Sequence, residues 1–464
     1  MVEETCDKLM QLLNTRQYAT FMHEVDELNP VDAAEFLTQL PEERLPAVFR
    51  LLKKDTAADV FAELDPEIQQ KIITAMTDRE LSGILEDLFV DDAVDMMEEM
   101  PASVVKRIMK NATPETRAEI NRFLAYPEDS AGSVMTSEYI ELKRTMTCTE
   151  AIDYIRKTGF EKETVYVAYV TDQQRILQGT VLLNELLFAQ PDTKIEDIMD
   201  ANTICVTTLD DQETVASLIS KYDLLALPVV DKEHRLVGIV TVDDAMDVMQ
   251  DEVTEDIEKM AAIVPSDKPY LKTGVFETWK KRIPWLLLLM ITATFTSTIL
   301  SSLENKIDSL FGVGVLTLSL AAFVPMLTDT GGNAGSQASV SIIRALSLNE
   351  ISAKDIFRIL WKELRVSFLC GITIAAACFI KVWVVDCRCR FTKECLFVPL
   401  IVSLTIFCAI VLAKLVGTLL PMLAKALKFD PAVMASPFIT TIVDTLTLLL
   451  YYFFVTNLLV RILT

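Results

Sequence analysis

The sequence predicts a multidomain membrane protein. A helical N-terminal domain, an α/β pair of similar copies and a connecting helix precede an all-α transmembrane domain of five helices. Residues 1–282 carry 29 basic and 56 acidic side chains, whereas residues 283–464 carry 14 and 10, in a chain of net charge −23. Long apolar runs begin only after residue 283. Near residue 127 a helical periodicity gives way to short strand patterns. Together these observations separate an acidic soluble part from a membrane part.

Residues 1–126 are expected to form an acidic helical domain. A short unit recurs in it, with apolar residues at helical spacing and a proline at the end. The three copies are Ala33–Pro41, Ala57–Pro66 and Ala93–Pro101. Their spacing is irregular, which indicates a degenerate helical repeat.

Three carboxylates stand out in this domain. Asp91, Asp92 and Asp95 share one helix face, because residues three and four positions apart are neighbours on a helix. Like charges held this close favour a divalent cation. The simpler interpretation of any single acid here is a solvated helix surface. The N-terminus carries no basic segment followed by an apolar core, so we expect no secretory signal and a cytosolic soluble part.

Residues 127–248 predict two α/β copies after the linker Tyr126–Thr136. Each copy runs strand, turn, strand, helix, and a helix precedes it. The pair resembles tandem CBS domains, and the second copy carries that family's G-I-V-T-x-x-D pattern from Gly238 to Asp244. The resemblance implies that Thr241 and Asp244 contact the ribose of an adenine nucleotide such as ATP. A purely structural dimerisation module is equally compatible, since the first copy has Asn184 in place of the aspartate.

Residues 249–282 predict an acidic connecting helix, because a dense run of acids from Asp243 to Glu258 extends into it. Such a run is often only a solvated linker. Its position directly before the first membrane segment also suits a plug at a cytosolic entrance. Trp279 and the basic residues 280–282 mark the expected cytoplasmic boundary of the membrane.

Residues 283–464 predict five membrane-spanning segments, because each apolar run reaches the roughly 20 residues that cross a bilayer. The segments are 284–303, 311–345, 366–386, 396–424 and 435–463. Starting from the cytosol, five crossings place the C-terminus outside, and the basic loops agree with this orientation. We therefore expect a multi-pass protein of the cytoplasmic membrane. Cys387, Cys389 and Cys395 fall in an outside loop, where disulfides are compatible with the location, although the pairing is open.

Polar residues interrupt two of these segments. Asp329, Gly332 and Asn333 lie in the stretch 323–346, and Asp444 lies in the last segment beside Thr441. An intramembrane carboxylate costs about 2.5–3.5 kcal/mol, so it requires a functional reason. A cation path supplies one, because Mg²⁺ prefers oxygen ligands and retains its water. The alternatives are a buried structural hydrogen bond for Asp444 and a helix cap or break for Asp329.

The whole chain resembles the MgtE family of magnesium channels and transporters. The order of domains carries the resemblance together with five motifs. These are Tyr126–Gly132, Val253–Ile257, Pro325–Ser339, Ile342–Leu346 and Phe429–Asp444. The resemblance implies a homodimer whose pore is lined by the second and fifth membrane helices, with Asp444 as the selectivity carboxylate. The second helix of the family often carries a neutral residue where this chain has Asp329, which leaves the role of Asp329 open.

The resemblance also implies cytosolic Mg²⁺ sites that close the pore when internal Mg²⁺ is high. By position, the implied ligands are Asp59, Asp91, Asp95, Asp211, Asp223, Asp244, Asp247, Glu252, Glu255, Asp256 and Asp430. Mg²⁺ that bridges carboxylates on separate domains would draw these domains together.

The sequence therefore predicts an Mg²⁺-selective channel or transporter for Mg²⁺ uptake that is in contact with membrane lipid. A nucleic-acid partner is not expected, because the acidic N-terminal part of the chain would repel phosphates. A proton- or sodium-coupled transporter of Mg²⁺, Co²⁺ or Mn²⁺ is the alternative. A membrane-anchored nucleotide sensor is a second one. An enzyme is not expected, because no nucleophile–base pairing, Walker loop or His/Cys metal set occurs.

Overall fold

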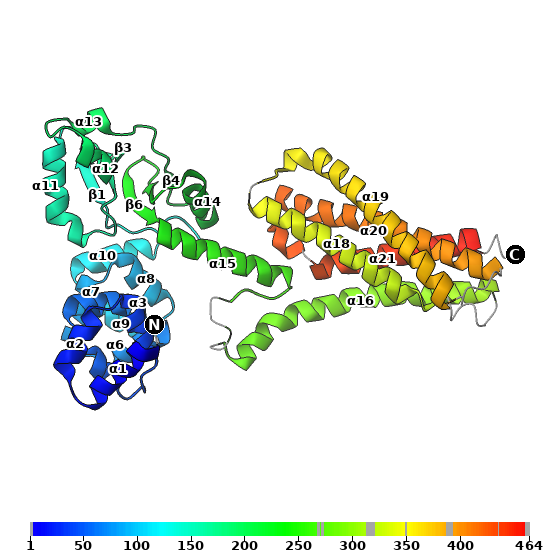
Figure 1. Cartoon of the computed structure of the whole chain (residues 1–464), viewed down its shortest axis with the longest axis horizontal. Coiled ribbons are helices and arrows are strands. Elements are labelled where there is room, and N and C mark those ends of the chain that lie inside the picture. Colours follow the sequence, from blue (N-terminus) through cyan, green and yellow to red (C-terminus); the bar gives the residue numbers. More distant parts are fainter. Residues whose placement is uncertain are drawn as a thin grey trace. The chain divides into compact units, whose positions relative to one another are not determined.

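The computed structural model of the chain describes residues 3–266, 270, 273–311, 321–348, 350–386, 393–434 and 436–459. The chain forms two compact units, Met1–Met249 and Gln250–Thr464. Figure 1 shows the chain coloured from blue at the N-terminus to red at the C-terminus, with most of its elements labelled. Cys387 and Cys389 lie outside the described residues, as does the side chain of Cys395, so their disulfides stay a prediction.

The N-terminal part is helical, as predicted. Its helices are α1 (Glu3–Asn14), α2 (Tyr18–Asp26), α3 (Pro30–Thr38), α4 (Leu45–Phe49), α5 (Lys54–Ala62), α6 (Pro66–Ala75), α7 (Asp78–Asp87), α8 (Val90–Glu98), α9 (Ala102–Asn111) and α10 (Pro114–Phe123). Capping side chains fix where several of these helices begin. Asn29 accepts a hydrogen bond from the Val31 N–H, and Thr77 forms a capping box with Glu80. These contacts satisfy backbone donors that a helix leaves unpaired.

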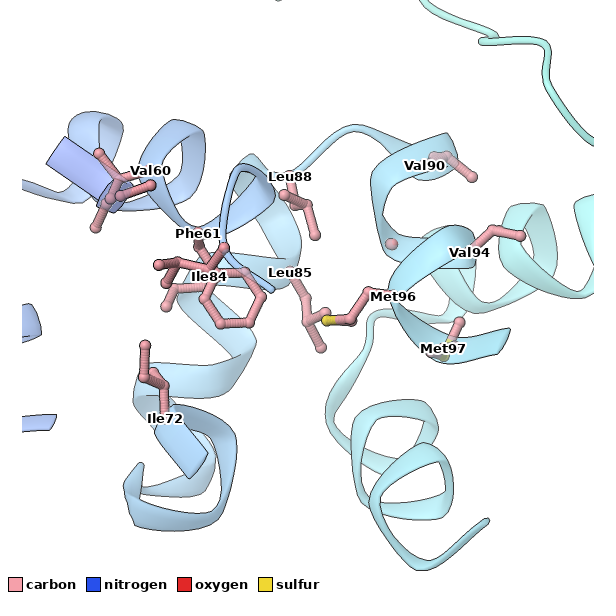
Figure 2. Close-up of a cluster of buried hydrophobic side chains, with 14 of the residues drawn as sticks. Val60, Phe61, Ile72, Ile84, Leu85, Leu88, Val90, Val94, Met96 and Met97 are labelled. Atoms are coloured by element: carbon pink, nitrogen blue, oxygen red, sulfur yellow. The ribbon is translucent and has the colours of Figure 1, made fainter. Parts of the chain in front are cut away.

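The repeated sequence unit corresponds to helices α3, α5 and α8. The same positions of each unit are buried: Ala33, Ala34, Phe36 and Leu37; Ala57, Ala58, Val60 and Phe61; Ala93, Val94, Met96 and Met97. Figure 2 shows part of the resulting core, in which Phe61, Ile84, Leu85 and Met96 belong to one buried cluster. The repeat therefore encodes helices that each bury one face against their neighbours.

The α/β part contains two three-stranded sheets of the same topology. The first sheet has the order β1 (Ile140–Lys143), β2 (Val167–Thr171), β3 (Leu177–Leu182), and the second has β4 (Val206–Thr207), β5 (Ala226–Val230), β6 (Leu236–Thr241). In each sheet the first pair is parallel and the second antiparallel. The hairpin turns face each other: Leu177 N–H donates to His234 O, and Leu236 N–H donates to Arg175 O. The two predicted copies are thus structurally equivalent.

The helices of this part are α11 (Cys148–Thr158), α12 (Leu183–Phe188), α13 (Ile195–Ile198), α14 (Gln212–Tyr222) and α15 (Val242–Met260). Helix α15 starts directly after strand β6. It continues past Met249, where the first compact unit ends, so its last three turns or so belong to the second unit.

The second unit consists of long helices. They are α16 (Val275–Phe311), α18 (Val324–Ser347), α19 (Ile356–Lys381), α20 (Lys393–Ala426) and α21 (Ser436–Phe454). By length and composition, four described helical stretches could cross a membrane: Val275–Ser302, Ile356–Asp386, Leu396–Ala426 and Pro437–Leu458. Helix α18 is not among them, since its glycines and polar residues lower its mean hydropathy. The expected span 311–345 is described as a helix only from Val324, with residues 312–320 outside the described residues. The count of five crossings stays a prediction.

Candidate functional site

Helix α18 packs against α21 through two adjacent glycines. A Cβ atom on Gly332 would lie 3.1 Å from Thr440 Cγ2 and 3.6 Å from the Asp444 Oδ1 atom. A Cβ atom on Gly331 would lie 3.0 Å from the Thr447 hydroxyl oxygen. The glycines therefore let the α18 backbone approach the side chains of α21 closely. This contact brings the predicted residues Gly332 and Asp444 together.

The same helix is fixed from a second side by α20. A Cβ atom on Gly417 would lie only 2.2 Å from the Gly335 carbonyl oxygen, and one on Gly335 would lie 3.2 Å from the Ala413 carbonyl oxygen. The first separation is compatible with glycine alone, and the second leaves little room for a side chain. The polar stretch of α18 is thus closely packed between α20 and α21.

One face of α18 is polar and exposed in the single chain. Asp329, Asn333 and Gln337 recur every four residues, and all three are exposed. The half-buried Asp444 lies close enough to Asp329 for their carboxylates to repel each other. Polar groups are not stable against hydrocarbon, so this face requires water or another protein surface at membrane depth.

The threonines of α21 present oxygen atoms near Asp444. The hydroxyls of Thr440 and Thr441 both donate to the Pro437 carbonyl, at 2.9 and 3.0 Å. Thr445 Oγ1 lies 3.3 Å from Thr296 Oγ1 of α16. The hydroxyl protons of Thr440 and Thr441 are engaged within their own helix, while the oxygen lone pairs stay available to a hydrated cation. Thr441 is therefore compatible with its predicted place beside the ion path.

A second group of carboxylates gathers in the first unit. Asp91, Asp92 and Asp95 of α8 interact electrostatically with Asp244 of α15. Two further acids of the α/β part, Glu138 and Glu163, face the same group. We call these six residues the acidic cluster. The sequence predicted Asp91, Asp95 and Asp244 as ligands, and it gave Glu138 and Glu163 no role.

Burial and mutual repulsion disfavour ionisation in the acidic cluster. Burial, followed by the charges of Asp92, Glu138 and Asp244, raises the pKa of Asp91 to about 8. Burial, followed by the charge of Asp244, raises the pKa of Asp92 to about 6 and that of Glu163 to about 7. Among the described residues, Asp91 Oδ1 is a buried oxygen with no hydrogen-bond partner. A cation would relieve both the repulsion and the unmet acceptor.

Other predicted ligands lie beside the acidic cluster. The Asp59 charge acts on Asp92. The Asp247 charge raises the pKa of Glu63, after burial as the larger cause. The Thr241 hydroxyl donates to Asp244 Oδ2 at 2.7 Å, so the two residues predicted to contact a nucleotide touch each other. Asp244 therefore belongs both to that pair and to the acidic cluster.

Asp211 and Asp223 occupy opposite ends of α14. Asp211 is the N-cap and accepts a hydrogen bond from Glu213 N–H, and Asp223 is the C-cap, with a left-handed φ of 53°. Eleven helical residues span about 16 Å, so these two carboxylates cannot bind one ion within this chain. Each has a structural role that does not depend on a metal.

The remaining predicted ligands lie on α15 and the α20–α21 connection. Lys259 Nζ lies 2.7 Å from Glu255 Oε1 and 2.7 Å from Asp430 Oδ2. The Ser347 hydroxyl of α18 donates to Asp256 Oδ2 at 3.0 Å. Glu252 lies one turn before Asp256. In the part of the chain that the structure describes, no three His, Cys, Asp or Glu side chains are arranged to surround a metal ion.

The chain matches known families along its length. MgtE, described as a divalent cation transporter, matches residues 324–454. The MgtE intracellular N domain matches residues 28–129, and the CBS domain matches residues 195–251. A curated magnesium transporter MgtE of Thermus thermophilus is 36% identical over 454 residues, which is 97% of this chain and 98% of that protein.

The chain belongs to the MgtE family. The magnesium transporter MgtE of Bacillus subtilis strain 168 is 30% identical over 451 residues, covering 97% of this chain and 96% of the relative. The crystal structure of the soluble part of a magnesium transporter is 31% identical and covers 54% of this chain and 98% of that structure, with a TM-score of 0.52. The resemblance drawn from the motifs is thus confirmed, as is the order of a helical domain, a CBS pair and a helical C-terminal part.

Proposed function

We propose that this chain carries Mg²⁺ across the cytoplasmic membrane along a path formed by α18 and α21. The single observation that carries the proposal is the Asp444 carboxylate, which lies in α21, a helix long and apolar enough to cross a bilayer, against the Gly332 backbone of α18. The size of Gly332 leaves space beside Asp444, and the carboxylate attracts a hydrated cation. The full-length relatives that carry the name magnesium transporter support the choice of ion.

The exposed polar face of α18 supports a homodimer. Asp329 and Asn333 are exposed in the single chain, although their helix packs into the membrane part. A second copy related by two-fold symmetry would shield this face from lipid and place two Asp444 carboxylates around one path.

Flux into proteoliposomes tests the function. The purified full-length chain should take up Mg²⁺, measured with a trapped fluorescent indicator, without an imposed proton or sodium gradient. Asp444→Asn should abolish this uptake while the protein still reconstitutes. Uptake that requires a proton or sodium gradient would favour the coupled transporter instead, and absent uptake in the unsubstituted protein would refute the function.

The acidic cluster supports closure by internal Mg²⁺. Its carboxylates repel one another, and a bridging Mg²⁺ would favour the arrangement in which they lie together. Neutralising Asp91, Asp95, Asp247 and Glu255 together should leave transport that continues at millimolar internal Mg²⁺. Unchanged inhibition in patch recordings would contradict this part of the proposal.

The contact of Thr241 with Asp244 supports a regulatory adenine nucleotide at the second CBS copy. ATP binding to the full-length chain, measured by equilibrium dialysis, should weaken in Thr241→Val. Because Thr241 carries no carboxylate, inhibition by Mg²⁺ should persist in this variant. Equal ATP binding by both proteins would remove Thr241 from the nucleotide site.

A further inference from the structure

Lys259 connects two elements that were both predicted to bind Mg²⁺. It lies in the last turn of α15, and its ammonium contacts Glu255 on its own helix and Asp430 on the α20–α21 connection, at 2.7 Å each. The second oxygen of Asp430 accepts a hydrogen bond from Ala432 N–H at 2.8 Å. Both oxygens of Asp430 therefore have partners supplied by the chain itself.

Neighbouring contacts show that this end of α15 is docked within its unit. Met260 packs against the buried pair Ile343 and Ala432. The Ser347 hydroxyl donates to Asp256. The Lys259 side chain is 23% exposed, so its two ion pairs are partly shielded from water.

Charge explains why the lysine matters for this docking. Without its ammonium, the carboxylates of Glu255 and Asp430 would face each other across the contact and repel. A cation between them would remove this repulsion and favour the docked position of α15. Lys259 supplies one that is covalently attached and present at any Mg²⁺ concentration. A Mg²⁺ ion that bridges the same carboxylates must displace the ammonium, because the two cations repel each other.

We propose that Lys259 is a tethered counter-ion that holds α15 against the α20–α21 connection when Mg²⁺ is scarce. It competes with Mg²⁺ for Glu255 and Asp430 and so determines how steeply closure depends on internal Mg²⁺. Lys259 acts through these carboxylates and is a positioning residue. The inference has two halves: Lys259 docks α15 (the docking half), and it competes with Mg²⁺ during closure (the regulatory half). Only the regulatory half rests on the proposed function.

Transport tests the regulatory half. In proteoliposomes with Mg²⁺ varied on the side of the soluble domains, Lys259→Met should raise flux at the lowest Mg²⁺ by about two- to fivefold, the range of a partly exposed ion pair. Closure should also become steeper, because Mg²⁺ now fills an empty bridge. Lys259→Arg should behave like the parent. Lys354→Met, which removes an exposed positive charge from the same unit, is the control and should change neither quantity.

Cross-linking tests the docking half without transport. In a full-length chain with its native cysteines replaced, Met260→Cys and Ala432→Cys should form a disulfide readily in EDTA. Adding Lys259→Met should slow this reaction several-fold, and Mg²⁺ should restore it. If Lys259→Met cross-links in EDTA as fast as the parent, Lys259 does not hold α15 in its docked position. If transport by Lys259→Met depends on internal Mg²⁺ as in the parent, Lys259 does not regulate closure. If the parent carries no Mg²⁺ at all, the proposed function fails while the cross-linking result still stands.

Discussion

Gly332 of α18 and Asp444 of α21 meet in the membrane part, where a Cβ on the glycine would lie 3.6 Å from the carboxylate oxygen. Because Gly332 has no side chain, the carboxylate lies close to the α18 backbone. This relationship links two motifs more than a hundred residues apart in the sequence. A substitution of Gly332 therefore tests the proposed ion path as directly as one of Asp444.

Gly332→Ala should impair transport without unfolding the protein. The new methyl group would lie 3.1 Å from Thr440 Cγ2, which forces a small local displacement next to Asp444. Alanine also favours the helix by about 1 kcal/mol over glycine, so the helix itself is not weakened. Mg²⁺ uptake into proteoliposomes should fall several-fold. Gly274→Ala is the control, since a Cβ there meets nothing within 4 Å, and equal uptake by both variants would contradict the packing argument.

Asp329 should assist Asp444 without replacing it. Its exposed carboxylate adds negative potential near Asp444, so it raises the local concentration of cations. Asp329→Asn should reduce uptake at low external Mg²⁺ and leave the maximal rate nearly unchanged, whereas Asp444→Asn should abolish uptake at every external Mg²⁺ concentration. Uptake measured over a range of external Mg²⁺ separates these effects. A full loss of the maximal rate in Asp329→Asn would show that Asp329 contacts the ion directly.

The sequence predicted those residues that differ clearly from their neighbours in the chain or that recur in a regular pattern. Asp444 stands out because an isolated carboxylate in an apolar segment has few explanations. The repeated helices were recognisable because burial recurs at the same positions of each unit, as Leu37, Phe61 and Met97 show. In both cases the signal comes from neighbouring residues of a single helix, so it can be recognised in one sequence.

Residues brought together by folding were missed. Glu138 and Glu163 join the acidic cluster only because the α/β part folds against α8, and neither has a local signal. Lys259 offered a partial signal, since Glu255 and Lys259 are spaced i, i+4 on a helix. Its second partner, Asp430, lies far along the chain and could not be paired with it from spacing.

Mg²⁺-free protein should become less stable as pH rises, because of the acidic cluster. The folded-state pKa of Asp91 is raised from 3.8 to about 8, so between these values the folded protein holds a proton that the unfolded chain has released. The free energy of unfolding therefore falls as pH increases across that window. In EDTA, the melting temperature of the full-length protein should drop between pH 5 and pH 8.

Asp91→Asn should flatten that dependence and raise the melting temperature at pH 8, because it removes a charge that burial disfavours. Added Mg²⁺ should stabilise the parent at pH 8 more than the variant. Asp192→Asn, at an exposed position, serves as the matched control and should leave the profile unchanged. A variant less stable than the parent at pH 8 would mean that Asp91 is ionised and favourably paired.

Lys414 of α20 and Glu363 of α19 form a shielded ion pair in the second unit. Their charged atoms lie 3.9 Å apart, and their side chains are only 9% and 15% exposed. Removing one member of a buried pair leaves the other charge uncompensated, at about 3–5 kcal/mol. Lys414→Met should therefore lower the melting temperature of the detergent-solubilised protein strongly, and Glu363→Gln should do likewise. The double variant should be more stable than either single one, because no charge is left unpaired. Additive losses in this cycle would show that the two side chains do not act as a pair.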